Sequence, residues 1–213
     1  MAEREWTGVF IAILLMFLIA GLPALSKFDP LVVTQVFVSS VLIIGGSVLL
    51  RKAFAYSLDA SAKHEIWHFY RYGIRPGWHF PKALPFGIIL PAFFAFLGLL
   101  AQFPIMLFTF LTYETRALKH RAAKRFGFYS YTEMTDWHNA LIGASAIVVV
   151  LVFSLIGYLA NFEVLAKLAA YYAFWNMLPF SNLDGTHILF GNRVLYAVLA
   201  ITTLVFTVYA MWI

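Results

Sequence analysis

Five consecutive residues, His64-Glu65-Ile66-Trp67-His68, carry side chains that could together do metal chemistry. On a helix, residues four apart lie one turn above each other, so the imidazoles of His64 and His68 could reach a single metal ion. Glu65 would point about 100° round such a helix and could reach a water molecule on that metal. This spacing is typical of zinc hydrolases, in which the metal lowers the pKa of its water and a carboxylate takes the proton. The alternative is an amphipathic helix with scattered polar residues.

A second group of such residues lies in an apolar stretch nearer the C-terminus, at Asn176, Pro179, Leu183, Asp184 and Gly185. An ionisable residue in an apolar span is energetically expensive and indicates a functional site. Proline removes a backbone hydrogen bond and opens a helix, and glycine lets another backbone approach closely. The alternative is a kinked helix whose aspartate meets water or a lysine.

The composition indicates an integral membrane protein. Hydrophobic residues make up 62% of the 213 residues and charged residues only 12%, which is far from the balance of a soluble domain. The chain has no cysteine, which excludes disulfides and thiolate metal ligands. A net charge of +5 needs no nucleic-acid partner, because basic residues gather in the loops between spans.

Several uncharged runs are long enough to cross a bilayer core of about 30 Å as helices. We therefore expect an all-α, polytopic membrane protein of about five to six transmembrane helices, with a re-entrant or broken-helix segment. The expected divisions are an N-terminal hairpin over 1–50, a membrane core over 51–193 and a C-terminal helix over 194–213. The predicted spans are 8–25, 31–50, 137–161, 168–192 and 194–213.

Two segments between these spans need separate treatment. Apolar residues recur near helical spacing in 51–82, which predicts an amphipathic helix carrying the His64–His68 stretch and ending at Gly73. The stretch 83–113 holds 31 uncharged residues, about 46 Å as a straight helix, with three prolines. We expect 84–112 to form a re-entrant hairpin or a broken helix pair, with a single tilted helix as the alternative.

Basic loops predict the orientation in the membrane. They put the N-terminus, 51–82 and Arg193 on the cytoplasmic side and the C-terminus outside. Asp184 lies nine residues before Arg193, so it should sit at a shallow cytoplasmic depth, close to the level of His64 and His68. The two groups of residues are therefore expected to share one site, facing the cytoplasm in a prokaryotic cell membrane.

The two motifs together resemble those of the site-2 protease family of intramembrane zinc metalloproteases, which combine HExxH with a later membrane segment reading N-x-x-P-x-x-x-L-D-G. The resemblance covers about residues 53–192. It implies that His64, His68 and Asp184 bind Zn²⁺ and that Glu65 is the catalytic base. It also implies that Asn176 orients the substrate or the developing oxyanion. The substrate would be a transmembrane protein, cut within the lipid bilayer by metal-activated water.

Two other functions remain open at this stage. One is a catalytically inactive relative that binds membrane helices, and the other is a small ion or metal carrier that uses the same three ligands in transit. His187, three residues after Asp184, is either a hydrated residue near a helix end or a donor to Asp184 or replacement ligand. The substrate and the oligomeric state cannot be read from the sequence.

Overall fold

Long apolar helices build most of the protein in the computed structural model, which describes residues 2–26, 29–71, 75, 77–101, 106–118 and 134–212. Within these residues, four helices are long and apolar enough to cross a membrane. They are α1 (Ala2–Ser26), α2 (Pro30–Ser57), α5 (Asp136–Leu159) and α8 (Arg193–Trp212). Their bounds agree with four of the five predicted spans.

Side-chain caps fix where three of these helices begin. The Asp29 carboxylate accepts hydrogen bonds from the first turn of α2, and proline follows it at the first helical position. Thr135 caps α5 in the same way, and the Asn192 amide accepts from the backbone N–H of Leu195 in α8. Such caps satisfy N–H groups that have no partner inside the helix.

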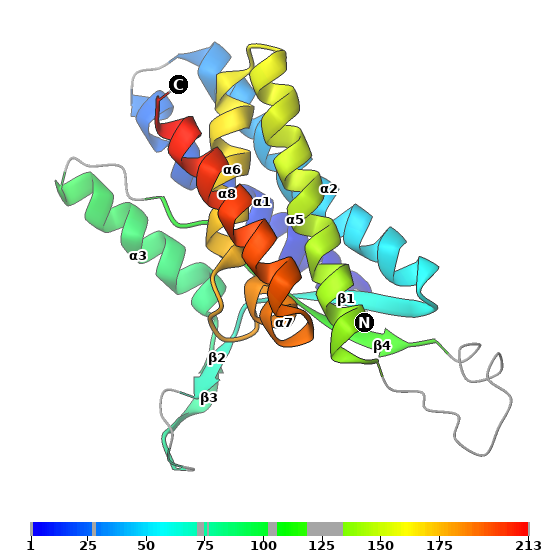
Figure 1. Ribbon diagram of the computed structural model, residues 1–213. Coiled ribbons are helices and arrows are strands. Elements are labelled where there is room, and N and C mark those ends of the chain that lie inside the picture. Colours follow the sequence, from blue (N-terminus) through cyan, green and yellow to red (C-terminus); the bar gives the residue numbers. More distant parts are fainter. Residues whose placement is uncertain are drawn as a thin grey trace, which may run out of the picture.

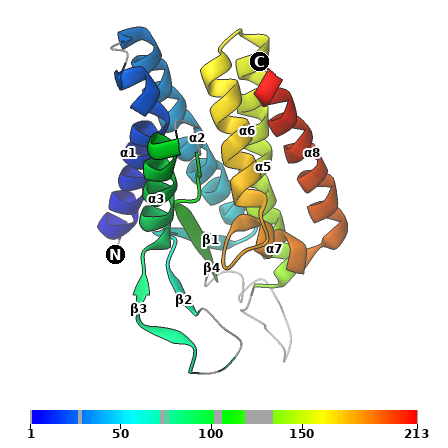
Figure 2. The ribbon, with the colours of Figure 1, turned by 90° about the vertical axis from the view of Figure 1, so that its left-hand side faces the viewer.

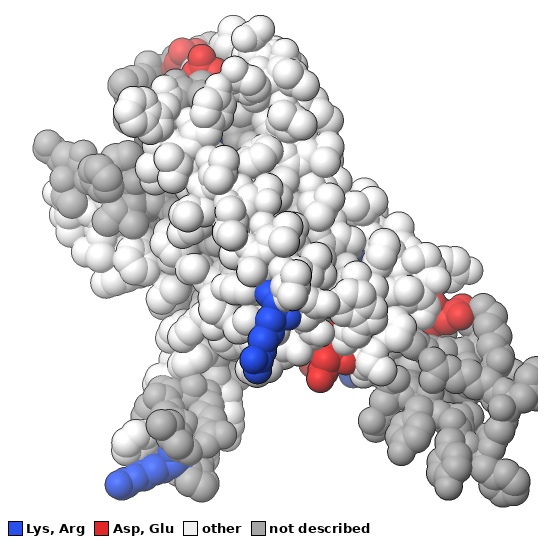
Figure 3. Space-filling view, in the orientation of Figure 1, with Lys and Arg blue, Asp and Glu red and all other residues white. Residues whose placement is uncertain are grey.

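The helices pack side by side around one hydrophobic cluster, to which α1, α2, α5, α6 (Glu163–Met177), α7 (Asp184–Gly191) and α8 all contribute (Figures 1 and 2). The outer surface of this bundle is also apolar. In Figure 3 charged side chains lie near the two ends of the bundle, and the face between them is uncharged. A bundle with this surface is compatible with a lipid environment.

The fold is not all-α, because it contains two small antiparallel sheets. In the first, β1 (Ala60–Ile66) pairs with β4 (Leu111–Ala117), with His64 opposite Tyr113. In the second, β2 (Phe69–Arg71) pairs with β3 (His79–Leu84). Both sheets lie at one end of the helical bundle (Figure 2).

The prediction of a helix over the His64–His68 stretch is wrong. Helix α2 ends at Ser57, and Asp59, in a left-handed conformation with φ 54°, turns the chain into β1. Along β1, the side chains of Ala60, Ala62 and His64 are buried, whereas those of the odd-numbered residues between them are more exposed. This alternation has the period of a strand, not of a helix.

The segment after the sheets confirms that 84–112 is not one uninterrupted helix. Helix α3 (Phe86–Ala101) spans 16 residues, about 24 Å, with Pro91 inside it. Residues 106–110 have no regular secondary structure, and β4 begins at Leu111. The orientation of this segment in a membrane, with both ends on the cytoplasmic side, stays a prediction. The basic residues 119–125, on which that prediction partly depends, lie outside the described part of the chain.

The predicted span 168–192 is two helices rather than one. Helix α6 ends at Met177, before Pro179, and α7 begins at Asp184. Gly185 lies directly against the end of α6, since a Cβ atom there would overlap the carbonyl oxygen of Met177. The break therefore brings Asp184 back toward α6, as the proline and glycine in the motif suggest.

The ends of the chain lie at opposite ends of the bundle. The N-terminal end of α1 lies at the same end as the sheets and α7, whereas the C-terminal end of α8 lies at the other end (Figures 1 and 2). The His64–His68 stretch and Asp184 therefore lie toward the same end of the molecule. This matches the similar depth expected for them from the basic loops.

Candidate functional site

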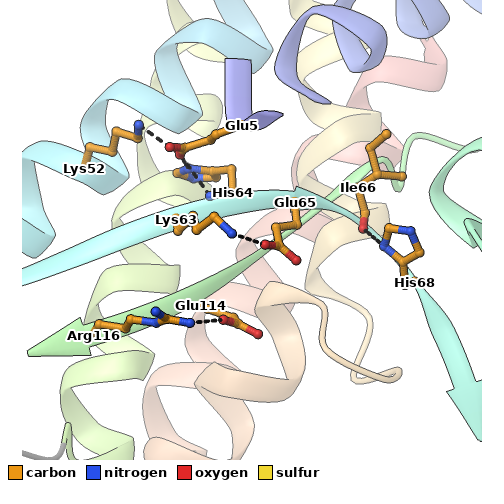
Figure 4. Close-up of polar contacts among 9 residues, drawn as sticks. All are labelled: Glu5, Lys52, Lys63, His64, Glu65, Ile66, His68, Glu114 and Arg116. Atoms are coloured by element: carbon orange, nitrogen blue, oxygen red, sulfur yellow. Dashed lines mark hydrogen bonds and ion pairs between the residues drawn. The ribbon is translucent and has the colours of Figure 1, made fainter. Parts of the chain in front are cut away.

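His64 is fully buried and held by a carboxylate from the first helix. The Glu5 side chain accepts a hydrogen bond of 3.0 Å from the His64 backbone N–H, and the same oxygen lies 3.2 Å from Nδ1 of the ring. Lys52 of α2 forms an ion pair of 2.9 Å with that oxygen (Figure 4). Glu5 therefore joins α1, α2 and β1 at one point.

Burial lowers the pKa of His64 to about 3, and the nearby positive charge of Arg51 acts in the same direction. Glu5 opposes this shift only in part. His64 is therefore neutral at physiological pH, and the contact with Glu5 assigns its proton to Nδ1. Its Nε2 is buried with no hydrogen-bond partner among the described groups.

Glu65 and His68 do not share the surroundings of His64. Glu65 lies on the opposite face of β1, is 46% exposed and pairs with Lys63 (Figure 4). His68 follows the end of β1, is exposed, and its Nδ1 lies 2.6 Å from the carbonyl oxygen of Ile66. In the strand conformation, the helical spacing that would bring the two histidines and the glutamate together does not exist.

Trp67, to which sequence reasoning gave no role, is the buried residue of this stretch that joins several elements of the fold. Its side chain is 1% exposed, and its indole N–H donates to the Ser181 hydroxyl at 3.2 Å. Its backbone donates to Phe110 and accepts from Gly87, each at 2.9 Å. Trp67 thereby connects the β1–β4 sheet with α3 and with the loop between α6 and α7. A lone tryptophan beside two histidines gave no local signal of this role.

Asp184 is paired with an arginine rather than with histidines. Its carboxylate forms a buried ion pair with Arg51 of α2, and both side chains are only 2% exposed. The Tyr113 ring lies against the guanidinium group, 4.5 Å from its carbon to the ring centroid. Among the described groups, Asp184 Oδ1 and Arg51 Nε have no hydrogen-bond partner. Within the described residues, the ion pair thus leaves one carboxylate oxygen without a hydrogen bond.

His187 and Asn176 lie near this pair in the fold. The His187 ring packs against Tyr113, with 4.8 Å between ring centroids, and its Nε2 has no partner in the described part of the chain. A role for His187 as a ligand or donor to Asp184 stays a prediction. Asn176 is buried, and its amide nitrogen donates to the carbonyl oxygens of Phe108 and Tyr172. It therefore fastens the segment 106–110 to α6, and the contacts to a substrate expected of it stay a prediction.

A groove of about 1360 Å³ runs beside β1, between α1 and α2. Glu5, Gly8 and Ile11 line it from α1, and Lys52 and Tyr56 line it from α2. All residues of β1 line it as well, together with His68, Arg116 and Leu118. The groove thus adjoins the edge of β1 that is opposite to β4.

The predicted zinc ligands do not fit a zinc ion in this arrangement. Nδ1 of His64 faces Glu5, His68 lies beyond the end of the strand, and Asp184 is held by a permanent cation. Within the described residues, no three His, Cys, Asp or Glu side chains form a group that could hold a metal ion. A zinc ion on these residues stays a prediction from the motifs, and we derive no catalytic step through it.

Comparisons of the chain with protein-family models, with curated proteins and with solved structures give no match. The resemblance to the site-2 protease family therefore depends on the two sequence motifs. Of these, the second has a structural counterpart in the break between α6 and α7, whereas the first is a β-strand.

Proposed function

We propose that this chain is an integral membrane protein that binds an extended segment of another membrane protein without cleaving it. The observation that carries the proposal is the edge of β1 beside the groove, which pairs with no other strand among the described residues. An unpaired strand edge presents backbone N–H and C=O groups with which an extended peptide can pair. Because such groups are costly in a bilayer unless they are paired, an edge near a membrane is a strong site for a locally unwound helix.

Backbone hydrogen bonds identify the residues that face this edge. The Trp67 N–H donates to Phe110 at the end of β4, so odd-numbered residues of the strand direct their backbone groups toward β4. Even-numbered residues direct theirs to the other side, and the His64 N–H accordingly bonds to Glu5. Ala62 lies two residues before His64, so its backbone N–H and C=O also point away from β4, toward the groove.

The walls of the groove suit a peptide from a membrane protein. Gly8 and Ile11 of α1 present an apolar wall, with Gly8 against Ile66. The charged side chains that line the groove are largely paired with one another, as Lys52 with Glu5 and Lys63 with Glu65. An apolar extended segment would meet backbone groups on one side and apolar side chains on the other.

Binding is better supported than cleavage because the residues needed for hydrolysis are apart. Glu65 lies on the face of β1 opposite His64, and Asp184 is neutralised by Arg51. A hydrolase would need a metal-bound water within hydrogen-bond reach of its general base. The zinc endopeptidase predicted from the motifs is therefore the second candidate, and the test below distinguishes the two.

The absence of cysteine from the chain makes disulfide crosslinking a direct test. A synthetic apolar transmembrane peptide with one central cysteine and a Gly-Pro break would be reconstituted in liposomes with Tyr56→Cys, whose position lines the groove and is 73% exposed. We expect an oxidative crosslink with the broken peptide and little with a matched unbroken helix. The control is Leu204→Cys on α8, a position 51% exposed.

Two results would contradict this function. Equal crosslinking at positions 56 and 204 would mean that the groove does not select the peptide. Cleavage of the peptide, lost on chelation of zinc and in Glu65→Gln, would establish the predicted endopeptidase instead. Recovery of the peptide at its full mass from the crosslink is the expected result.

A further inference from the structure

The hairpin formed by β2 and β3 projects from the end of the bundle that carries the candidate site (Figures 1 and 2). Its base is fixed to the rest of the fold. The Phe69 ring packs against Phe86 of α3 and stacks on Phe180, with 4.8 and 5.7 Å between ring centroids. Its outer part is exposed, and Tyr70 and Trp78 each leave nearly half of their surface uncovered. Large aromatic side chains that gather on a projecting surface indicate an interaction site.

The charges on this hairpin have one sign. The sequence contains no aspartate or glutamate from residue 66 to residue 113. Arg75 and Lys82 are exposed, and neither takes part in an ion pair among the described residues. In Figure 3 the charged side chains drawn on this projection are basic. The hairpin therefore offers cations, not neutralised within the described chain, to an anionic partner.

The exposed rings of Tyr70 and Trp78 each lie beside a nitrogen-containing side chain. The guanidinium carbon of Arg75 lies 5.4 Å from the centroid of the Trp78 ring. The Tyr70 ring stacks on His79, with 4.9 Å between centroids and 12° between the planes. Tryptophan and tyrosine are enriched where a membrane meets water, and lysine and arginine beside them are attracted to anionic lipids. The hairpin has this combination of side chains.

Helix α3 would place the hairpin at the surface of a bilayer. Strand β3 ends at Leu84 and α3 begins at Phe86, so a single residue separates them. Lys82 precedes Phe86 by four residues, about 13 Å of extended chain. A dissolved polyanion would meet the same cations, but only a lipid surface would also cover the apolar helix joined to them. The large apolar side chains that α3 exposes are Ile89, Phe93, Phe96, Leu99 and Leu100.

We propose that the β2–β3 hairpin docks on the headgroup layer of the surrounding membrane, with Tyr70 and Trp78 in the interface and Arg75 and Lys82 on the phosphates of anionic lipids. The inference rests on the membrane location that is part of the proposed function, but not on what the groove beside β1 binds. Because β2 begins two residues after Trp67, docking also holds the end of β1 at a fixed distance from the membrane surface.

The experiment uses the full chain in lipid nanodiscs with one fluorophore on the hairpin. Gly77→Cys supplies a single thiol, because the natural chain has no cysteine, and a Cβ atom at position 77 would meet no atom within 4 Å. Quenching of the label by lipids with a nitroxide headgroup would be compared in phosphatidylcholine discs and in discs that also contain phosphatidylglycerol. We expect stronger quenching in the anionic discs, and a smaller difference at high salt, which screens exposed charges.

Two double variants test the charges. Arg75→Gln/Lys82→Gln should remove most of the dependence on phosphatidylglycerol, because each basic residue near an anionic surface favours binding by about fivefold. The matched control, Arg116→Gln/Arg193→Gln, removes two exposed basic side chains outside the hairpin and should keep that dependence. Trp78→Ala should weaken the quenching in both kinds of disc, because it removes an interfacial ring.

A second labelled position separates this inference from the membrane location. Ala160→Cys, between α5 and α6 at the other end of the bundle, should be quenched to the same extent in both kinds of disc. Quenching at position 160 without quenching at 77 overturns the docking of the hairpin alone, and no quenching at either position overturns the membrane location as well. Equal losses in the two double variants also overturn the inference. Binding of RNA to the chain in neutral discs, abolished by Arg75→Gln/Lys82→Gln, would assign the hairpin to a nucleic acid instead.

Discussion

Arg51 stands near the end of an apolar helix, a common place for a basic residue that reaches toward water. Its side chain is instead turned inward and is 2% exposed. Removing a charge from water is costly, and the attraction between two buried charges offsets that cost only when both are present. At the scale of single residues, the structure therefore depends on keeping Arg51 and Asp184 together.

The first prediction concerns this pair. Arg51→Met and Asp184→Asn should each lower the free energy of unfolding by about 3–5 kcal/mol, because each leaves one buried charge alone. The double variant should recover much of that loss, since neither charge remains. Thermal unfolding in detergent measures all four proteins.

The control for the pair is an exposed ion pair, Glu163 with Lys167, four residues apart on α6 at 3.7 Å. Glu163→Gln should change stability by less than about 0.5 kcal/mol. Strictly additive losses in the double variant Arg51→Met/Asp184→Asn would contradict the role of the two residues as one unit.

The second prediction concerns pH. The pKa of His64 is lowered to about 3 in the folded protein, from an ordinary value of 6.5, chiefly by burial. Between these values the unfolded chain takes up a proton that the folded chain does not. Stability should therefore fall as pH is lowered through 6.5, by up to about 1.4 kcal/mol for each pH unit. Arg51 and Lys52 of α2 favour the neutral form, and Glu5 of α1 opposes it.

The variant that tests this is His64→Asn, whose amide can donate to Glu5 much as Nδ1 does but does not titrate. Its stability should depend less on pH between 6.5 and 5 than that of the natural chain. His68→Asn, at an exposed position, serves as the control. An unchanged slope in His64→Asn would show that another group causes the pH dependence.

At the scale of elements, Trp67, the residue that follows β1, packs against two other parts of the fold. Trp67 lies edge-to-face against Phe86 and Phe180, each with 5.8 Å between ring centroids. These rings come from α3 and from the loop between α6 and α7. A single side chain thus holds three elements against each other.

The third prediction follows from this position. Trp67→Ala should cost about 3–5 kcal/mol of stability, as expected for the loss of a large buried aromatic side chain. Trp78→Ala is the matched control, because Trp78 is 46% exposed and should tolerate the change. Trp67→Phe keeps most of the ring and loses the bond to Ser181, so a loss of about 1 kcal/mol is expected. Similar unfolding temperatures for the two alanine variants would mean that Trp67 is not an anchor.

Much of this element structure could be predicted from local sequence. The uncharged runs predicted α1, α2, α5 and α8, because each run has about the length that a helix needs to cross a bilayer. The break between α6 and α7 was signalled by Pro179 and Gly185. The strand β1 was also signalled, by the alternation of small or apolar residues with polar ones, but the spacing of His64 and His68 favoured a helix.

The candidate site could be predicted less well, for a physical reason. The partner of Asp184 is on α2, far away in sequence, and no local periodicity reports a contact of that kind. Arg51 and Lys52 at the end of an apolar run have a sufficient explanation as flanking charges. The role of Glu5 as a partner of His64 was hidden similarly, in a short polar N-terminal segment.

At the scale of the whole molecule, the two sheets and the candidate site lie at one end. Both sheets, α7 and the start of α1 lie there, and the C-terminal end of α8 lies at the other (Figures 1 and 2). Exposed apolar side chains cover α8, including Ile201 and Val205, and also α3, including Phe96 and Leu100. A molecule of this kind would bury its helices in lipid and keep the groove beside β1 near one membrane surface.

The distance in sequence between Arg51 and Asp184 also sets an order of events during synthesis. The chain grows at about 5–20 residues per second, so the 133 residues between them take roughly 7–27 s to make. Throughout that interval the nascent α2 carries a permanent charge whose final partner does not yet exist. In a chain that inserts into a membrane as proposed above, α2 would keep that charge hydrated by leaving its end at the membrane surface. The helix would then reach its final depth late, when α7 emerges and supplies the carboxylate.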